Sequence, residues 1–150
     1  MRRRDGFTLL ELMVTVLILG ILSATAIPLY HTWTQRAYGT EASLMMKQII
    51  DGEVLYFLEH DDFFPGAGEV WIINADGTTT PNNIDVLGKI KEALKVQIPL
   101  GHHLQYDLSN TGTGLLVVTI SSENLSFPLF KGGVTTLTAG LDTEGKVEYY

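Results

Sequence analysis

The stretch GFTLLELMVTVLILGILSATAIP, residues 6–28, decides the fold of this chain. From Phe7 to Gln35 the sequence is apolar or uncharged except for Glu11. The uncharged part, residues 12–35, exceeds the ~20 residues that a helix needs to cross about 30 Å of hydrocarbon. A charged side chain at the centre of a bilayer costs roughly 2.5 kcal/mol or more. Glu11 therefore marks a candidate functional site and needs a partner.

Composition and charge limit the classes of protein to consider. The chain has 150 residues, 45% of them hydrophobic, which is enough for one domain with its own core. The formal net charge is −7; residues 1–6 contribute +2 of it, which leaves −9 for the rest. An acidic body of this kind argues against nucleic acid as a partner. The chain has no cysteine, so disulfides, thiolate catalysis and Cys-based metal sites are excluded.

The basic start and the apolar run allow three interpretations. A secretory signal peptide would be cut near the small residues Ala24-Thr25-Ala26, but Glu11 interrupts its apolar region and the apolar character continues to Trp33. A plain membrane anchor explains the length but gives Glu11 no purpose. The third interpretation is a precursor that loses only a short basic leader. For an anchor or such a precursor, Arg2, Arg3 and Arg4 predict a cytoplasmic N-terminus.

Residues Gly6-Phe7-Thr8-Leu9-Leu10-Glu11, after a short positively charged leader, resemble the prepilin signature of the type IV pilin family, which includes the pseudopilins of type II secretion. The resemblance is dense through Pro28, looser to about Pro65 and architectural beyond. It implies that a prepilin peptidase cuts between Gly6 and Phe7 and that Phe7 is then methylated. It also implies that Glu11 is carried into the core of a filament.

This resemblance supplies the partner that Glu11 lacks. Cleavage would create an α-amine at Phe7, and the amine of one subunit could approach Glu11 of another in a bundle of identical helices. Two unit charges about 4 Å apart attract by ~4 kcal/mol at an effective dielectric constant near 20, the same scale as the cost of the charge in lipid. In an unassembled subunit, we expect Glu11 to lie at the headgroup level and reach water.

The sequence predicts one long helix from Phe7 to about Leu58, roughly 78 Å at 1.5 Å per residue. Pro28 removes a helical hydrogen bond, so we expect a kink or an opened turn nearby. Gly20 and Ala24 form a small-xxx-small pair that allows close approach of another helix. Beyond Gln35, a helical apolar stripe predicts a face that packs on a sheet. This stripe comprises Tyr38, Ala42, Met45, Ile49 and Tyr56, flanked by Met46 and Phe57.

The remainder predicts a small α+β head. We expect a short strand at 70–73, a turn at Asp76-Gly77, a polar connector at 78–83 and a helix at 84–95 capped by Asn83. The final third predicts antiparallel strands at 104–108, 115–120, 125–130, 134–141 and 146–150. The division is therefore a cleaved leader, 1–6; a transmembrane or filament-core helix, 7–35; and a globular head, 36–150. The head comprises an amphipathic helix half to about 58, a connecting region, 59–103, and an antiparallel sheet, 104–150.

No catalytic or cofactor motif accompanies this architecture, so we predict neither an enzyme nor a cofactor. The acidic run 59–62 and the pair His102-His103 are interpreted as surface residues rather than metal ligands. The resemblance implies a type IV pilus subunit that forms a homo-oligomeric filament with a peptidase and methyltransferase, an assembly platform and an ATPase as partners. It would lie in the inner membrane before assembly and in an extracellular pilus or a periplasmic pseudopilus afterwards.

Three alternatives stay open. The first is the major pseudopilin of a type II secretion system, since pseudopilins often lack the paired cysteines of many pilins. Their calcium-binding loop, however, has no clear counterpart in this sequence. The others are a secreted soluble domain with an ordinary signal peptide and a membrane-anchored enzyme.

Overall fold

The computed structural model describes residues 7–82, 84–101 and 103–150 and has the expected α+β fold. The chain forms two compact units, residues 1–34 and 35–150, which are considered separately. The leader, Asn83 and His102 lie outside the described residues. Helix α1 covers Leu9–His60 and belongs to both units, close to the predicted limits of 7 and 58.

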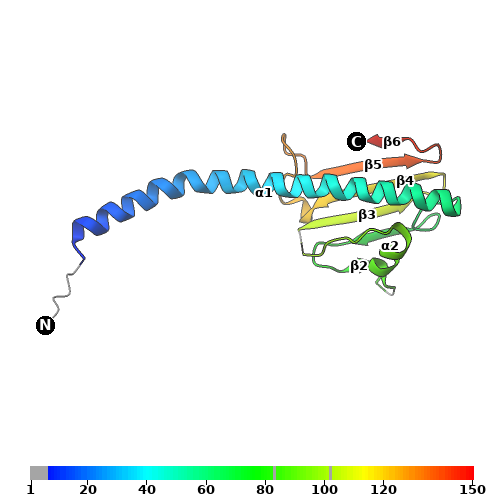
Figure 1. Ribbon diagram of the computed structural model, residues 1–150, viewed down its shortest axis with the longest axis horizontal. Helices are drawn as coiled ribbons and strands as arrows, with labels where there is room; N and C mark the ends of the chain where they lie inside the picture. Colours follow the sequence, from blue (N-terminus) through cyan, green and yellow to red (C-terminus); the bar gives the residue numbers. More distant parts are fainter. Residues whose placement is uncertain (1–6, 83, 102) are drawn as a thin grey trace. The chain divides into compact units, whose positions relative to one another are not determined.

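The second unit, which we call the head, contains a six-stranded antiparallel sheet of order β2-β1-β3-β4-β5-β6 (Figure 1). Its two edges are short: β2 has two residues and β6 has three. The strands are β1 (Val70–Ile73), β2 (Thr79–Thr80), β3 (Leu104–Asn110), β4 (Leu115–Ser122), β5 (Thr136–Asp142) and β6 (Val147–Tyr149).

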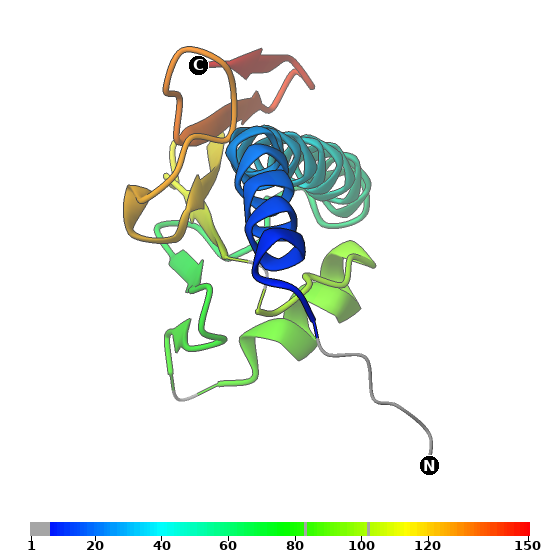
Figure 2. The same ribbon diagram turned by 90° about the vertical axis from the view of Figure 1, so that its left-hand side faces the viewer.

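Side chains alternate across this sheet, and one face is covered. In β3 every second residue from Leu104 to Asn110 is buried, as the period of two requires. Its partner strand β4 is in register with it, so that Tyr106 lies opposite Ile120 and both are fully buried. Helix α2 (Val86–Leu94) and residues 35–60 of α1 cover the same face of the sheet (Figure 2). The core of the head lies between these helices and the sheet.

The predicted stripe of α1 is confirmed as the helical side of this core. Ala42, Met45, Met46 and Ile49 are buried, and Tyr38, Tyr56 and Phe57 pack against them while partly exposed. Two glycines permit close packing: a Cβ on Gly39 would lie 2.3 Å from the backbone oxygen of Leu129, and one on Gly52 would lie 2.6 Å from that of Leu94. Any other residue at these two positions would overlap the backbone of the head, so both positions require glycine.

The helix predicted at 84–95 is confirmed as α2 with slightly shorter limits, and one local prediction, after β4, is wrong. Helix α2 begins at Val86, because the side chain of Asp85 accepts a hydrogen bond from the N–H of Gly88 at 2.9 Å and caps the helix; Lys95, in the left-handed region, ends it. The predicted cap, Asn83, lies outside the described residues. The segment 125–130 is not a strand. Asn124 and Leu125 have positive φ in the short helix η1 (Glu123–Leu125), and Pro128 has no N–H for a ladder.

The connecting region also contributes to the sheet. The strand predicted at 70–73 is confirmed as β1, which pairs with β3, and the turn at Asp76-Gly77 is closed by a bond from the N–H of Gly77 to the oxygen of Asn74. The expected polar connector holds β2, in which Thr79 and Thr80 pair with Ile73 and Ile72. The sheet therefore starts at Val70 rather than at Leu104. The strands predicted at 134–141 and 146–150 are found as β5 and β6, which pair across a hairpin at 142–145.

Candidate functional site

The start of α1 is built by a local capping motif. The backbone N–H of Glu11 donates to Oγ1 of Thr8 at 3.3 Å, and the N–H of Leu12 donates to the backbone oxygen of Thr8 at 3.2 Å. Thr8 and Glu11 have the spacing of a capping box, and a carboxylate in the first turn favours the positive end of the helix dipole. The carboxyl group of Glu11 is thus placed one turn from Phe7 and is exposed.

The first unit presents an uncovered apolar helix. Between Phe7 and Trp33 the large hydrophobic side chains are 47% to 75% exposed, and every residue from 7 to 33 is exposed. By length and composition, α1 is the one described helix that could cross a membrane. Exposed apolar surface on this scale marks an interaction with lipid or protein.

Three threonine hydroxyl groups in this segment are satisfied within the helix. Oγ1 of Thr15 donates to the oxygen of Leu12 at 2.8 Å, and Oγ1 of Thr25 donates to that of Leu22 at 2.9 Å. Oγ1 of Thr32 donates to the oxygen of Pro28 at 3.1 Å. Because hydrocarbon offers no hydrogen-bond partners, internal bonds of this kind suit a helix in lipid.

The remaining predicted site residues lie on the same exposed segment. Gly20, Ala24 and Pro28 are all exposed, and a Cβ added to Gly20 would meet no atom within 4 Å. The opened turn considered at Pro28 is not found, because the residues around it are all helical; a bend in the helix axis stays a prediction. Gly6, the predicted residue before the cut, lies outside the described residues.

In the head, sequence reasoning missed a buried carboxyl group. Glu53 is 0% exposed; its Oε2 accepts a hydrogen bond from the N–H of Phe64 at 3.0 Å, and its Oε1 has no hydrogen-bond partner. Burial raises the pKa of Glu53 to about 8; the Phe64 N–H bond opposes this shift and the nearby carboxylate of Asp62 adds to it. Its position between Ile49 and Tyr56 on the predicted stripe was the signal that could have revealed it.

Asn110, at the end of β3, holds the loop that follows α1. Its Nδ2 donates to the backbone oxygens of Phe63 at 3.0 Å and Pro65 at 2.9 Å, and to Oδ1 of Asp62 at 3.2 Å. Since Glu53 holds the N–H of Phe64, the loop after α1 is tied to both the helix and the sheet. This loop has a structural role in the head.

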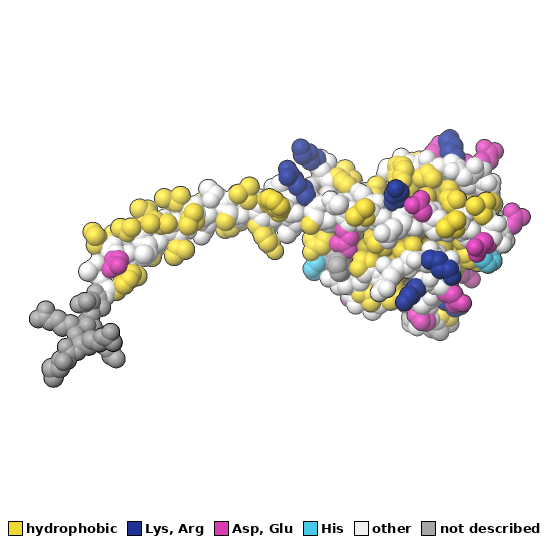
Figure 3. Space-filling view, in the orientation of Figure 1, with side chains coloured by type: hydrophobic (Ala, Val, Ile, Leu, Met, Phe, Trp, Pro, Cys, Tyr) yellow, Lys and Arg dark blue, Asp and Glu magenta, His cyan; other side chains and the backbone are white. Residues whose placement is uncertain are grey.

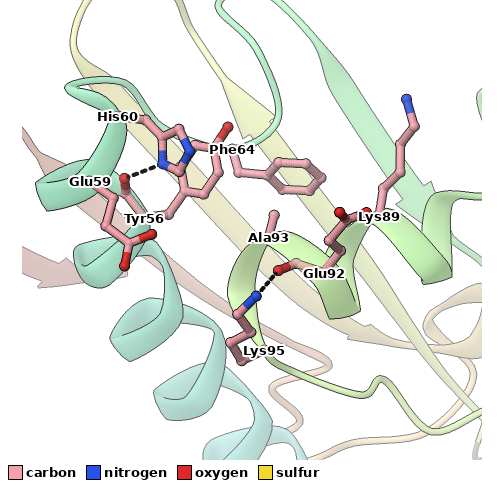
Figure 4. Close-up of a pocket in the computed structure, with 8 residues that line it drawn as sticks. All are labelled: Tyr56, Glu59, His60, Phe64, Lys89, Glu92, Ala93 and Lys95. Atoms are coloured by element: carbon pink, nitrogen blue, oxygen red, sulfur yellow. Dashed lines mark hydrogen bonds between the residues drawn. The ribbon is translucent and has the colours of Figure 1, made fainter.

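Glu59 and His60, the first two residues of the acidic run 59–62, border an open hollow of about 460 Å³ between the end of α1 and α2 (Figure 4). His60 stacks on Tyr56 with ring centroids 4.1 Å apart, and Nζ of Lys95 donates to the backbone oxygen of Glu92 at 2.5 Å. Within the described residues, no three or more His, Asp or Glu side chains are grouped to hold a metal ion. His103 instead lies 2.7 Å from Oε2 of Glu123.

Comparisons with known proteins agree with the N-terminal geometry. The family model "Prokaryotic N-terminal methylation motif" matches residues 1–27. A fimbrial protein of Neisseria meningitidis is 28% identical over 147 residues, which cover 98% of this chain and 72% of that protein. The type IV major pilin protein PilE of Neisseria gonorrhoeae is 27% identical over 123 residues, 82% of this chain and 60% of that protein.

Other relatives match shorter parts. The type IV major pilin protein PilA of Myxococcus xanthus is 38% identical over 68 residues, 45% of this chain and 31% of that protein. Apart from the meningococcal protein at 72%, the chain spans three fifths or less of the lengths of these relatives. No solved structure matches the chain significantly.

Proposed function

We propose that this chain, which belongs to the type IV pilin family, is a structural subunit of a pilus filament, made as a precursor that is cut between Gly6 and Phe7 and methylated at Phe7. The observation that carries the proposal is the methylation motif followed directly by an apolar helix that its own chain leaves uncovered. Its similarity to pilins supports a structural role rather than an enzymatic one.

The uncovered helix requires two successive environments. Lipid of the inner membrane would cover residues 7–34 before assembly, and the same segments of other subunits would cover them in the filament. Gly20 supports the second step, because no atom of its own chain requires a glycine there and a missing side chain lets another helix approach. Ala24, one turn later on the same side of the helix, also has a small side chain and extends the surface on which another helix could approach closely.

Glu11 would direct each new subunit into register. After cleavage, the α-amine of Phe7 on one subunit would pair with the carboxylate of Glu11 on another, and this attraction would offset the cost of a charge away from water. Support comes from the position of Glu11, which is in the first turn and has no ion-pair partner among the described residues. The pairing links the processing step to assembly.

The partners follow from this pathway. A prepilin peptidase and methyltransferase would process the precursor, and a membrane assembly platform with an ATPase would polymerise it. Arg2, Arg3 and Arg4 support an orientation with the N-terminus in the cytoplasm. The head would then lie outside the inner membrane and form the surface of an extracellular pilus.

A second candidate within the family is the major pseudopilin of a type II secretion system. The absence of cysteine favours it, because pseudopilins often lack the cysteine pair of many pilins. Deletion of the coding sequence separates the two: loss of surface fibres supports the pilus, whereas loss of exoprotein release with no change in surface fibres supports the pseudopilus.

The intact mass of the protein extracted from membranes tests the proposal. A chain that begins at Phe7 and carries one added methyl group is expected, and the variant Gly6→Val is the matched control that should keep the leader. A mature chain that begins at Ile27 would contradict the proposal and indicate an ordinary secreted protein. A full-length chain would indicate a plain membrane anchor.

A further inference from the structure

One end of the head carries an apolar groove with an acidic rim, which we call the acidic groove. Its walls are formed by Val54, Phe57 and Phe63 with Leu141, and Asp142 and Glu144 stand at its rim. Its volume is about 130 Å³, and the rings of Phe57 and Phe63 stack with centroids 4.7 Å apart. The groove is small enough to hold one or two apolar side chains.

The rim of the groove is acidic and is held in place by backbone hydrogen bonds. Oδ1 of Asp142 accepts hydrogen bonds from the N–H groups of Glu144 at 3.0 Å and Lys146 at 2.8 Å, which holds the hairpin in place. The nearby cation, Lys146, is already paired with Glu148, at 2.5 Å between Nζ and Oε1. Asp61 and Asp62 at the end of α1 add further negative charge close to the wall residue Phe63.

The other end of the head carries an exposed turn of opposite charge, residues 130–134, which we call the basic turn. The N–H of Phe130 donates to the oxygen of Val134 at 3.2 Å and closes the turn, and Nε2 of Gln35 donates to the oxygen of Phe130 at 2.8 Å and ties it to α1. Lys131 is exposed, Val134 is 46% exposed, and the exposed cation Arg36 follows Gln35. The turn thus presents an apolar side chain and one cation, and Arg36 adds a second cation on α1 next to the residue that ties the turn to the helix.

These two features lie far apart in one head. From Arg36 to Val54, α1 rises by about 27 Å at 1.5 Å per residue. Strand β5 begins two residues after the basic turn and ends at the groove residue Asp142. In Figure 3, Lys and Arg side chains stand out at the left-hand end of the head, and several Asp and Glu side chains lie at its right-hand end. The chain cannot fill its own groove with its own turn.

We propose that the acidic groove of one subunit receives the basic turn of a second copy of this chain. Val134 would enter the apolar part while Lys131 and Arg36 face Asp142 and Glu144. The contact joins different surfaces of identical subunits, and a heterologous contact that does not close into a ring generates a helical filament. It also offsets the repulsion between heads that are acidic as a whole. This inference rests on the proposed function, because it names a head-to-head contact of the same filament.

Cross-linking between subunits tests the contact directly. The natural chain has no cysteine, so the variant Lys131→Cys with Glu144→Cys carries the only thiols. It is co-expressed with the unsubstituted chain so that filaments form, and sheared filaments are treated with a short bis-maleimide. Covalent dimers and higher multimers are expected. The control, Lys131→Cys with Lys89→Cys, places the second thiol on exposed α2 outside the groove and should stay monomeric.

Charge reversal gives a second readout. Lys131→Glu and Glu144→Lys should each lower the mass of sheared filaments about two- to fivefold, the range expected for an exposed ion pair, and the double reversal should restore it. Normal filaments with no cross-link, or single reversals with full filament mass, would overturn the contact and leave the proposed function standing. A failure of the unsubstituted chain to form any filament would contradict the proposed function itself.

Discussion

The two halves of helix α1 both carry large apolar side chains, but these side chains are covered in different ways. Residues 35–60 bury eight positions, including Ala42, Met46 and Ile49, against the sheet and α2 of their own head. Residues 9–33 bury none, although they are the more apolar half. The fold of one chain therefore accounts for the apolar residues of the second half. Those of the first half are accounted for only by what surrounds the chain.

The glycines and the carboxylates of α1 show the same division. Gly39 and Gly52 are required by backbone atoms within 3 Å of the missing Cβ, but Gly20 faces open space. Glu53 is buried and bonded to the N–H of Phe64, whereas Glu11 is exposed and has no ion-pair partner among the described residues. Substitutions at matched positions can therefore separate the demands of folding from those of assembly.

The largest effect is expected from Glu11→Val. Removing the carboxylate should leave membrane insertion and the melting of the head unchanged but abolish incorporation into filaments, because the α-amine of Phe7 loses its partner. Sheared-filament yield and the membrane-bound fraction are the two measurements. Leu12→Val, an apolar change at the next position, is the control that should keep filaments. Filaments at the normal level from the Glu11 variant would refute the pairing.

The second carboxylate should affect stability and its pH dependence. The pKa of Glu53 has its ordinary value of 4.5 in the unfolded chain and is raised to about 8 in the folded head. Between these values the folded chain holds a proton that unfolding releases, so the stabilisation is complete below about pH 4.5 and is lost as the pH rises through about 8. A shift of this size corresponds to about 5 kcal/mol at most, at about 1.4 kcal/mol per pKa unit.

Glu53→Gln tests this prediction, because the amide oxygen can still accept the Phe64 N–H bond but cannot titrate. Thermal melts of the detergent-solubilised chain near pH 5 and near pH 8 should show a fall for the natural protein and a much smaller fall for the variant. Equal falls in both proteins would mean that Glu53 is not the titrating group. Asp62, the nearest carboxylate that interacts with Glu53, can be replaced by Asn as a control.

The smallest effects are expected from the glycines. Gly52→Ala should destabilise the head by about 1–3 kcal/mol, because the new methyl group overlaps the oxygen of Leu94. Gly20→Ala should leave melting unchanged or slightly raise helix stability, by up to ~1 kcal/mol, while lowering filament yield. Melting curves and filament yield are measured for both variants. Equal loss of head stability in the two would remove the distinction between the halves of α1.

The sequence predicted the elements whose signals are long and periodic. The single helix was expected at 7–58 and is found at Leu9–His60, and the stripe from Tyr38 to Tyr56 is confirmed as its core face. Strands at 70–73, 104–108 and 115–120 are confirmed, since alternation and β-branched residues act locally. These features depend on the chain's own pattern and need no tertiary information.

Features that depend on distant partners could not be predicted. Strand β2 has two residues and exists because β1 lies beside it. The apolar composition of 125–130 suggested a strand, but Leu129 is instead buried in the core from a loop. Glu53 was missed because its partner, the N–H of Phe64, depends on a loop that Asn110 holds in place. The roles of Phe7, Glu11 and Gly20 stay predictions, because they concern neighbouring molecules.

The brevity of the two outer strands would have a consequence in the proposed filament, where many copies of the head would lie close together. The outer strands themselves, β2 and β6, have only two and three residues, and Pro81 directly follows β2. Long free borders invite uncontrolled cross-strand addition and amyloid-like growth. Short outer strands would therefore disfavour that route of aggregation in a filament, and ordered growth would depend on surfaces that do not require new backbone pairing.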